Sequence, residues 1–508
     1  MARTTHTLSL GELLDSSGVP VQVAEHARGI RVSGVADDSR AVREGDVYLA
    51  LRGARDDGRR FISDAIGRGA VAVLAESDDQ LAIDSQVAGV PVIAVRGLRA
   101  QAGTLASVFF GDPSHRMRVI AVTGTNGKTT TSWLIAGALS MLGRRAAVLG
   151  TLGVGAPGKC AALRNTTPGA VELQRLLAGL SDEGFEDVVM EASSIGIEQQ
   201  RLAGMRIQVA VFTNLTRDHL DYHGSMDAYA QAKATLFSWP GLAGAVINAD
   251  DPAALRWLAE GRVRAARVMT YGGAGHGHDI ELSAIASTTA ETTLRLVAGG
   301  EPVSVETRLL GRFNAANLMA VTGVLMTLGY RLQEIASVLG GLRAPEGRMQ
   351  SFGGDAGQPL CVVDYAHSPA ALESVLVTLR ERSKGTLWCV FGCGGDRDQG
   401  KRPEMGEVAA RLADQVVLTS DNPRSESPLA IIDDIRAGIP RGVNVHVEQD
   451  RARAIARAVT SARPGDVVLV AGKGHEDYQE VAGVRTPFSD AQSVQLALAA
   501  RAGGAACA

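Results

Sequence analysis

The chain has 508 residues, of which 45% are hydrophobic and 21% charged, and its formal net charge is −4. At roughly 150 residues per domain this length predicts about three domains, and the balanced charge excludes a global attraction to nucleic acid or to an anionic membrane. No uncharged apolar run approaches the roughly 20 residues of a membrane-spanning helix, and the N-terminus carries no apolar segment of signal-peptide length. We therefore expect a cytoplasmic protein without a membrane span or a nucleic-acid partner.

Short β-branched runs alternate with longer amphipathic segments along most of the chain, which is the pattern of parallel α/β layers. Turn signals at Phe110-Gly-Asp-Pro-Ser and at Ala344-Pro-Glu-Gly divide these runs into three blocks. The sequence thus predicts an α/β protein with domains at residues 1–110, 111–344 and 345–508. Strands are predicted at the apolar runs 46–51, 70–74, 90–95, 119–122, 187–190, 209–212, 244–247, 360–363, 387–391, 415–418 and 466–471.

Glycine and cysteine usage sets two further limits. The 59 glycines, set against 17 prolines and without a collagen-like period, indicate many tight turns and places where the backbone approaches a ligand closely. The five cysteines include no Cys-x-x-Cys pair, so we expect reduced thiols rather than disulfides or a zinc site.

The sharpest local signal is the segment Gly124-Thr-Asn-Gly-Lys-Thr-Thr, here named the phosphate loop, which lies between the run 119–122 and a helix predicted over 132–142. In that context backbone N–H groups and a helix N-terminus face an anion, and Lys128 supplies a point charge. The general nucleotide-binding pattern has glycine at position 122, where this chain has valine, and a glycine turn with an exposed lysine is the alternative interpretation. The residues expected at the phosphates are Gly124, Thr125, Asn126, Gly127, Lys128, Thr129 and Thr130.

The wording of this loop, GTNGKTT, resembles the ATP site of the Mur ligases and folylpolyglutamate synthetases, which join a carboxylate to an amine at the expense of ATP. Further matches follow in the family's order over nearly the whole chain: DSR at 38–40, GD at 45–46, NTTP at 165–168, EASS at 191–194, TNL at 213–215, DHLDYH at 218–223, DYAHSP at 364–369, GCGGDRD at 392–398, DNPR at 421–424 and GKGHE at 472–476. The resemblance implies three α/β domains: an N-terminal UDP-sugar domain, a central domain with a P-loop ATPase-like, mostly parallel sheet, and a Rossmann-like C-terminal domain that binds an amino acid.

A magnesium site is expected beside the phosphate loop. Thr129, directly after the lysine, is placed to put its hydroxyl on Mg²⁺, with Thr130 as the near alternative. Glu191 and His219 follow strands at the edge where open α/β sheets bind ligands, and the resemblance implies that both ligate the metal. It also implies that Lys233 is carbamylated, because an ammonium cannot coordinate Mg²⁺ whereas a carbamate can. Taken alone, the last three would be a surface carboxylate, a helix-capping histidine and a helical surface lysine.

The motif DNPR at 421–424 bears on substrate choice. By position alone it is an Asn-Pro turn with an exposed arginine. Family members with this wording add meso-diaminopimelate, whereas members that add L-lysine generally lack the arginine. A guanidinium can hold the second carboxylate of the diamino acid through two parallel hydrogen bonds, which agrees with that substrate. The resemblance implies contacts of Arg397 with the near end of the diamino acid and of Gly472 and Glu476 with its distal amino and carboxylate end. The motif residues Asp421, Asn422, Pro423 and Arg424 complete the implied set.

The resemblance also implies contacts for a UDP-sugar peptide and for the nucleotide. Those for the UDP-sugar peptide are Ser39, the segment 54–56, Asn165, Thr166, Thr167, Ser193, Gln199 and Arg201. Asn314 and Asn317 resemble adenine-side contacts and Asp364 a ribose-side acid, while a helix N-cap is an open alternative for the two asparagines. Two positions depart from the family pattern: Ile195 stands where histidine commonly follows the paired serines, and Asp37 is acidic where an apolar residue is common.

The resemblance therefore implies a ligase that adds meso-2,6-diaminopimelate to the D-glutamyl γ-carboxylate of UDP-N-acetylmuramoyl-L-alanyl-D-glutamate through an acyl phosphate, with ATP as co-substrate and Mg²⁺ as cofactor. We expect a monomer that acts on small molecules and closes its domains before chemistry, because an exposed acyl phosphate would hydrolyse. One alternative is the same chemistry on L-lysine or on folate, against which the DSR segment and Arg424 count. Another is a nucleotide-dependent switch protein, which would not need Arg397, Arg424 and Glu476 together.

Overall fold

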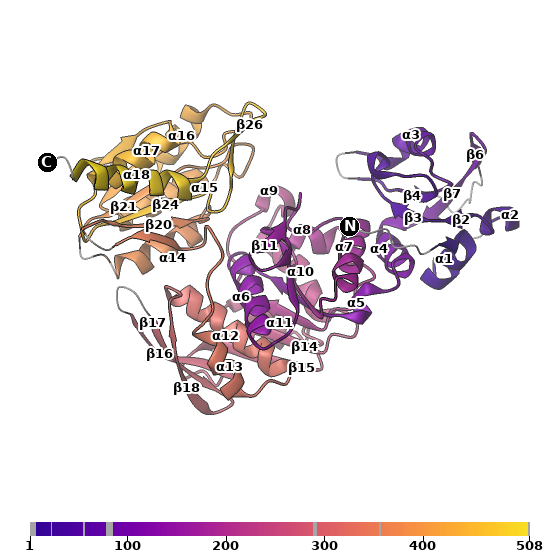
Figure 1. Cartoon of the computed structure of the whole chain (residues 1–508), viewed down its shortest axis with the longest axis horizontal. Coiled ribbons are helices and arrows are strands. Elements are labelled where there is room, and N and C mark those ends of the chain that lie inside the picture. Colours follow the sequence, from indigo (N-terminus) through magenta and orange to yellow (C-terminus); the bar gives the residue numbers. More distant parts are fainter. Residues whose placement is uncertain are drawn as a thin grey trace.

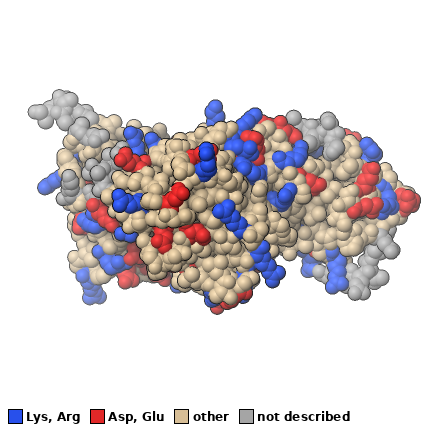
Figure 2. Space-filling view, turned by 90° about the horizontal axis from the view of Figure 1, so that it is seen from below, with Lys and Arg blue, Asp and Glu red and all other residues tan. Residues whose placement is uncertain are grey.

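The computed structural model describes residues 7–21, 23–53, 56–77, 85–287, 292–354, 357–381, 383 and 385–505. Sheets of five, eleven and six strands follow one another along the chain, and two short two-stranded sheets accompany them. Figure 1 shows three domains, with the eleven-stranded one between the other two. Within the described residues every helix is too short or too polar to cross a lipid bilayer. On the face shown in Figure 2, basic and acidic side chains are interspersed.

The N-terminal domain is a small α/β layer. Its strands are β1 (Leu8–Ser9), β2 (Arg31–Val32), β3 (Gly34–Ala36), β4 (Asp46–Ala50), β5 (Ala72–Ser77), β6 (Ser85–Val87) and β7 (Val90–Arg96). Its helices are α1 (Leu10–Ser17), α2 (Glu25–Arg28), α3 (Ile62–Gly67) and α4 (Leu98–Phe109), with 3-10 turns η1 (Ser39–Ala41) and η2 (Gly58–Phe61). The short helix α5 (Pro113–Arg116) follows the predicted boundary at residue 110 and begins the central domain. The sheet order is β3-β4-β5-β7-β6. Its core extends to Val171 and Ala178 of the next domain, so the two domains share apolar packing.

The central domain contains the eleven-stranded sheet. Its strands are β8 (Arg118–Thr123), β9 (Ala146–Gly150), β10 (Gly153–Ala156), β11 (Lys159–Ala161), β12 (Asp187–Glu191), β13 (Val209–Phe212), β14 (Gly244–Asn248), β15 (Arg267–Gly273), β16 (Ile280–Ser287), β17 (Thr292–Ala298) and β18 (Glu301–Thr307). Its helices are α6 (Lys128–Met141), α7 (Ala170–Asp182), α8 (Ser194–Glu198), α9 (Leu220–His223), α10 (Met226–Ala234), α11 (Pro252–Ala259), α12 (Arg312–Thr327) and α13 (Leu332–Leu339), with the 3-10 turn η3 (Thr235–Ser238).

Helices cover both faces of the central sheet. The strand order is β11-β10-β9-β12-β8-β13-β14-β15-β16-β17-β18. The strands from β9 to β16 in that order pair in parallel, and antiparallel ribbons complete both edges. Along β8, Ile120 and Val122 pack with α6 and α12, whereas Val119 and Ala121 pack with α7 and α11. Because successive side chains point to opposite faces, a strand buried on both sides reads as a continuous apolar run, which is how the sequence predicted it.

The C-terminal domain repeats this architecture on a smaller scale. Its strands are β19 (Gln350–Gly353), β20 (Leu360–Asp364), β21 (Leu387–Phe391), β22 (Gln415–Leu418), β23 (Val445–Val447), β24 (Val467–Ala471), β25 (Tyr478–Val481) and β26 (Val484–Pro487), and its helices are α14 (Pro369–Arg380), α15 (Lys401–Leu412), α16 (Pro428–Ala437), α17 (Arg451–Ser461) and α18 (Asp490–Ala505). The sheet order is β19-β20-β24-β21-β22-β23, and only β19 is antiparallel to its neighbour. Helices α14 to α16 pack on one face, and α17 and α18 pack on the other.

The predicted fold class is confirmed: the chain is a three-domain α/β protein with a mostly parallel central sheet. All eleven predicted strands are present, and the predicted helix corresponds to α6. The antiparallel ribbon β16–β18 and the hairpin β25–β26 were not predicted. In the ribbon, buried and exposed residues alternate, as in β17, whereas the hairpin has no fully buried residue, so both lack the continuous apolar signal of the parallel strands.

Candidate active site

The phosphate loop joins β8 to α6 at the C-terminal edge of the central sheet. Gly127 has a φ of 82°, and a methyl group on Gly124 would lie 1.9 Å from the hydroxyl oxygen of Thr213, so glycine is required at both positions. The Lys128 ammonium donates to the carbonyls of Gly124 (3.0 Å) and Thr125 (2.8 Å). Burial lowers the pKa of Lys128, and the carboxylates of Glu191 and Asp218 oppose that shift. This lysine is therefore folded into the loop, and the alternative of an exposed lysine in a glycine turn is wrong.

The end of β13 holds the phosphate loop in shape. Asn126 donates its backbone N–H to Asn214 Oδ1 (2.9 Å), and its carbonyl accepts from Thr213 Oγ1 (2.6 Å) and Asn214 Nδ2 (3.2 Å). Residues of the TNL motif therefore fix the phosphate loop through hydrogen bonds. Backbone groups ordered in this way are available to an anion without further reorganisation.

The four residues predicted at a metal line one cavity of about 380 Å³ beside the loop, namely Thr129, Glu191, His219 and Lys233. Thr129 Oγ1 donates to Glu191 Oε2 (2.9 Å), and the backbone N–H of Thr151 donates to Glu191 Oε1 (2.7 Å). Glu191 is the last residue of β12 and is 2% exposed, so it is not a surface carboxylate. Within the described residues no three His, Cys, Asp or Glu side chains gather in a metal-ligating group. A divalent cation here would consequently depend on the threonine hydroxyl and on a modified lysine as well.

Lys233 is buried in α10 rather than exposed on a helix surface. Its side chain is 1% exposed, donates to the Gly124 carbonyl (2.8 Å) and lies 4.3 Å from the centre of the Tyr229 ring. Burial and the charge of Lys128 lower the pKa of Lys233 well below its usual value, although Asp218 opposes the shift. In the described part of the chain it forms no ion pair. A buried amine without a carboxylate partner is suited to reaction with CO₂, which would give an oxygen donor set that fits Mg²⁺.

Most of the predicted UDP-sugar-peptide residues line the same cavity: Asn165, Thr166, Thr167, Ser193 and Arg201. The Arg201 guanidinium donates to the Thr167 carbonyl (2.6 Å) and to Gln199 Oε1 (2.7 Å with Nη2). Gln199 also donates to Tyr222 and stands outside the cavity lining. Ser39 is buried in the N-terminal domain and lines neither this cavity nor its neighbours. Ala54 and Arg55, from the segment 54–56, lie outside the described residues.

The histidine missing at position 195 has a spatial counterpart. His223, from α9, places Nε2 2.9 Å from the hydroxyl of Ser194, and its Nδ1 lies 3.2 Å from Glu198. Its side chain is 1% exposed, and burial lowers its pKa. An imidazole therefore does reach the paired serines, from a different element.

A second cavity, of about 260 Å³, lies between the phosphate loop, α12 and the C-terminal domain, and Asn314, Asn317 and Asp364 line it. Asn317 Nδ2 donates to Asn314 Oδ1 (3.0 Å), and Asn314 Nδ2 donates to the Leu310 carbonyl (2.8 Å). The N-cap of α12 is Gly311, so the helix-cap alternative for the two asparagines is wrong. Asp364 accepts two backbone N–H bonds at 2.8 Å each, and burial raises its pKa.

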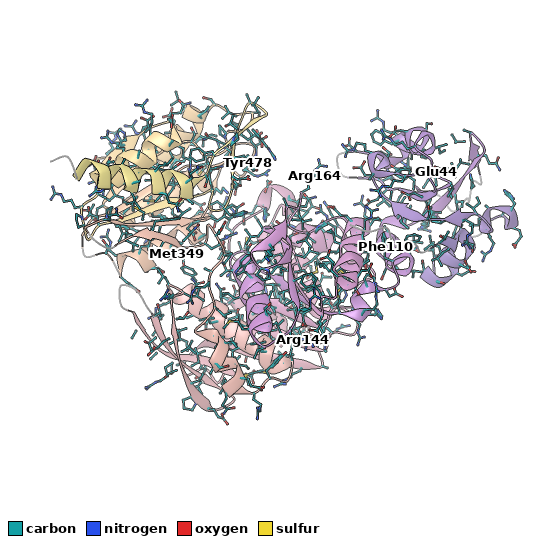
Figure 3. The ribbon with its side chains drawn as sticks, in the orientation of Figure 1. Glu44, Phe110, Arg144, Arg164, Met349 and Tyr478 are labelled. Carbon is teal, nitrogen blue, oxygen red and sulfur yellow. The ribbon has the colours of Figure 1, made fainter. Side chains whose placement is uncertain are left out.

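The third and largest cavity, of about 1020 Å³, lies between the central and C-terminal domains. Figure 3 labels Arg164 and Tyr478, which line it from these two domains. All but one of the predicted amino-acid contacts line this cavity: Arg397, Asp421, Asn422, Arg424, Gly472 and Glu476. Pro423 is not part of the lining.

Arg424 is not the exposed end of a simple turn. Its φ is 52°, its backbone N–H donates to the Glu480 carbonyl (3.1 Å), and its carbonyl accepts from Ala482 (2.6 Å). Its guanidinium donates to the Gly395 carbonyl (2.6 Å). The hairpin β25–β26 therefore holds this arginine at the cavity.

Three residues at the domain junction had no role predicted from the sequence, namely Arg348, Tyr365 and His367. Arg348 donates to Thr129 Oγ1 (3.3 Å), and its guanidinium lies 4.3 Å from the centre of the Tyr365 ring. His367 lies 3.9 Å from Asp218, and burial lowers its pKa to about 4. Tyr365 and His367 belong to the DYAHSP motif. Arg348 belongs to no motif, and its only signal in the sequence is its charge next to the Pro- and Gly-containing turn between two predicted domains.

Fold and site together define a nucleotide-binding α/β protein with three domains. In it the phosphate loop adjoins the large cavity lined by the predicted amino-acid contacts, which is named the amino-acid cavity here. Three consecutive segments match family descriptions in order: "Mur ligase family, catalytic domain" over residues 31–110, "Mur ligase middle domain" over 122–325 and "Mur ligase, glutamate ligase domain" over 347–474. The chain belongs to the Mur ligase family.

Curated relatives and solved structures agree with this assignment. Proteins named UDP-N-acetylmuramoyl-L-alanyl-D-glutamate--2,6-diaminopimelate ligase are 49% identical in Chromobacterium violaceum, over 93% of this chain and 95% of the relative, and 48% identical in Pseudomonas aeruginosa, over 91% and 94%. A solved structure with the same name is 37% identical, covers 98% of this chain and 99% of its own, and has a TM-score of 0.70. MurF ligase from Thermotoga maritima, solved in complex with ADP, is 22% identical over 93% and 98%, and its TM-score of 0.64 shows a common fold.

Proposed function

We propose that this protein is the ligase that adds meso-2,6-diaminopimelate to the D-glutamyl γ-carboxylate of UDP-N-acetylmuramoyl-L-alanyl-D-glutamate, with ATP as co-substrate, in peptidoglycan precursor synthesis. Relatives with that name are 48 to 49% identical over more than nine tenths of the chain. The observation that carries the proposal is the continuity of the cavities. Asn165, Thr166, His219 and Arg397 line both the phosphate-loop cavity and the amino-acid cavity, so a carboxylate and an amine can meet between them.

The chemistry follows from the poor electrophilicity of a free carboxylate. The γ-carboxylate oxygen attacks the γ-phosphorus of ATP, the bond to ADP breaks, and an acyl phosphate forms. The diaminopimelate amine then attacks the acyl carbon, and the tetrahedral intermediate expels phosphate while the nitrogen loses a proton. Lys128 and the backbone N–H groups of the phosphate loop would orient the phosphates, and the cavity walls would exclude water from the acyl phosphate.

We assign Mg²⁺ to the cavity beside the loop, where Thr129, Glu191, His219 and a carbamylated Lys233 would hold it. When bound, the ion supplies positive charge to the transferring phosphoryl group. The fit is supported by the Thr129–Glu191 hydrogen bond of 2.9 Å and by the buried amine of Lys233, which lacks a carboxylate partner. Thr130 lines the nucleotide cavity instead, which favours Thr129 as the hydroxyl ligand.

The substrates would contact the residues predicted for them from the sequence. The nucleotide would lie against Asn314, Asn317 and Asp364, and the diamino acid against Arg424 and its neighbours. Ser39 would contact the UDP-sugar from the N-terminal domain, and an approach of that domain to the central one would bring it closer to the cavities. We also propose domain boundaries after residues 110 and 344, a monomeric state and a cytoplasmic location, where ATP is available.

Phosphate release from ATP tests the function. The protein is incubated with ATP, the UDP-dipeptide and either meso-diaminopimelate or L-lysine, and phosphate and the tripeptide product are quantified. We expect release that depends on meso-diaminopimelate. Equal release without any amino acid would disprove ligation, and release with L-lysine alone would disprove the substrate assignment.

A further inference from the structure

Lys473 is a fully buried lysine directly behind the amino-acid cavity. It lies in the loop that follows β24, is 0% exposed and does not itself line the cavity. Its ammonium donates to Asn422 Oδ1 (2.9 Å) and to Glu476 Oε2 (2.9 Å), and it lies 4.0 Å from Asp421 Oδ1. All three of these partners do line the cavity.

The partners of Lys473 are joined to one another as well. Asn422 Nδ2 donates to Glu476 Oε2 (2.7 Å), and the backbone N–H of Glu480 donates to Asn422 Oδ1 (2.9 Å). Both hydrogen bonds of the Glu476 carboxylate therefore use Oε2. The other oxygen, Oε1, has no hydrogen-bond partner in the described part of the chain. It is also not fully buried, so it is open to the cavity.

We infer that Lys473 is a positioning residue for the diamino acid, acting through Glu476. This inference rests on the proposed function. The ammonium and the Asn422 amide hold Oε2 from behind, which leaves Oε1 facing the cavity as an acceptor for the distal ammonium of the substrate. Lys473 touches no substrate in this arrangement.

Charge balance supports the same role. Asp421 and Glu476 are two carboxylates at one end of the cavity, and they would repel each other without a cation between them. With Lys473 present, two negative charges and one positive charge leave a net charge of −1 in this cluster. One substrate ammonium neutralises that charge. A buried charge that is held by two hydrogen bonds also keeps a fixed geometry, because each alternative position would leave it unpaired.

The test is steady-state kinetics of Lys473→Met, which keeps most of the side-chain volume and removes the charge. We expect the KM for meso-diaminopimelate to rise by about 10- to 100-fold, the range for loss of a hydrogen bond to a charged group, while the KM values for ATP and the UDP-dipeptide stay within about twofold. Lys159→Met, which removes one exposed lysine from β11, is the matched control and should behave as the wild type.

A double variant decides whether Lys473 acts through Glu476. If it does, Lys473→Met combined with Glu476→Gln should raise the KM no further than Glu476→Gln alone, because coupled residues are not additive. The double variant also removes both charges of the buried pair, so it remains testable if the single lysine variant does not fold. Independent, multiplied effects would overturn the inference, as would an equal loss for all three substrates. A wild-type protein without diaminopimelate-dependent phosphate release would instead refute the proposed function.

Discussion

Arg424 combines an unusual backbone with a charged side chain at the cavity. A non-glycine residue in the left-handed region costs on the order of 1 kcal/mol and persists only where neighbours hold it, as the hairpin β25–β26 does here. We predict that Arg424→Ala raises the KM for meso-diaminopimelate by about 100-fold, because it would remove the proposed bidentate contact to the second carboxylate. Initial rates at varied substrate concentrations measure this. The KM for ATP should stay nearly unchanged, and a uniform loss for both substrates would indicate a folding role.

Lys233 offers a direct spectroscopic test. Carbamate formation consumes a neutral amine, and burial, which lowers the pKa of Lys233 well below its usual value, increases the neutral fraction. We predict a carbamate signal in the ¹³C NMR spectrum of protein equilibrated with ¹³C-bicarbonate, and its absence from Lys233→Ala. That variant should also lose nearly all activity and regain part of it with added formate. Full activity of the variant, without any response to bicarbonate or formate, would refute carbamylation.

His475 makes the stability of the folded protein fall as the pH is lowered. Burial and the charge of Arg348 lower its pKa to about 4, although Asp477 opposes the shift, and the ring lies 5.2 Å from that of Tyr365. Between about pH 6.5 and pH 4 the unfolded chain binds a proton that the folded chain does not, so this residue reduces stability as the pH falls through that window. We predict that the unfolding free energy of the wild type minus that of His475→Gln falls from pH 7 to pH 5, measured by urea unfolding. A constant difference would contradict it.

Site residues that stand in one short, contiguous motif could be predicted from the sequence. Residues whose role depends on partners far away in the chain could not. The phosphate loop and DNPR are short strings whose chemistry is local. Lys473 stood in a recognised motif, yet its function depends on Asn422, which is 51 positions away. Arg348 likewise reaches Thr129 across 219 positions. No spacing rule predicts such contacts, because the first joins loops after two strands of one sheet, β22 and β24, and the second joins two domains.

Among the elements, parallel strands were easier to predict than antiparallel ribbons. A strand buried on both faces, such as β24, is apolar at each of its five positions, whereas β26 is exposed along its whole length. The hairpin β25–β26 therefore carries no hydrophobic signal, although it fixes the backbone of Arg424. This hairpin supports the backbone of the candidate site rather than the core.

Helices α17 and α18 fix the two strand ends that carry the substrate loops. Arg451 donates to the carbonyls of Ser420 (3.3 Å) and Ala471 (2.9 Å) and forms a wholly buried ion pair with Asp490 (2.7 Å). Arg451→Met should lower the unfolding free energy of the C-terminal domain by about 3–5 kcal/mol, because Asp490 would remain as an unpaired buried charge. Urea unfolding followed by circular dichroism measures this. Arg453→Met, at an arginine whose side chain is 75% exposed, is the control and should change stability by less than about 0.5 kcal/mol.

At the scale of the whole molecule, the C-terminal domain contacts the active site, whereas the N-terminal domain lies away from it. Arg217 of the central domain lies 3.9 Å from Asp398 and 3.2 Å from Glu404 of the C-terminal domain, and Arg348 reaches the phosphate loop. The N-terminal domain packs instead on α7, and a methyl group on Gly103 of α4 would lie 2.1 Å from the Ala203 carbonyl. In Figure 1 the two outer domains stand at opposite ends of the molecule.

This arrangement predicts closure when the UDP-sugar substrate binds. Ser39 lines none of the three cavities, and we predict that a ligand that contacts both Ser39 and Arg201 draws the N-terminal domain toward the central one. Closure would also shield the acyl phosphate from water. We predict a smaller radius of gyration by small-angle X-ray scattering with the UDP-dipeptide and a non-hydrolysable ATP analogue than with the analogue alone. Ser39→Ala should weaken the change at a fixed, subsaturating concentration of the UDP-dipeptide. An unchanged radius at saturating concentrations, with binding verified by calorimetry, would show that the substrate bridges the domains without closure.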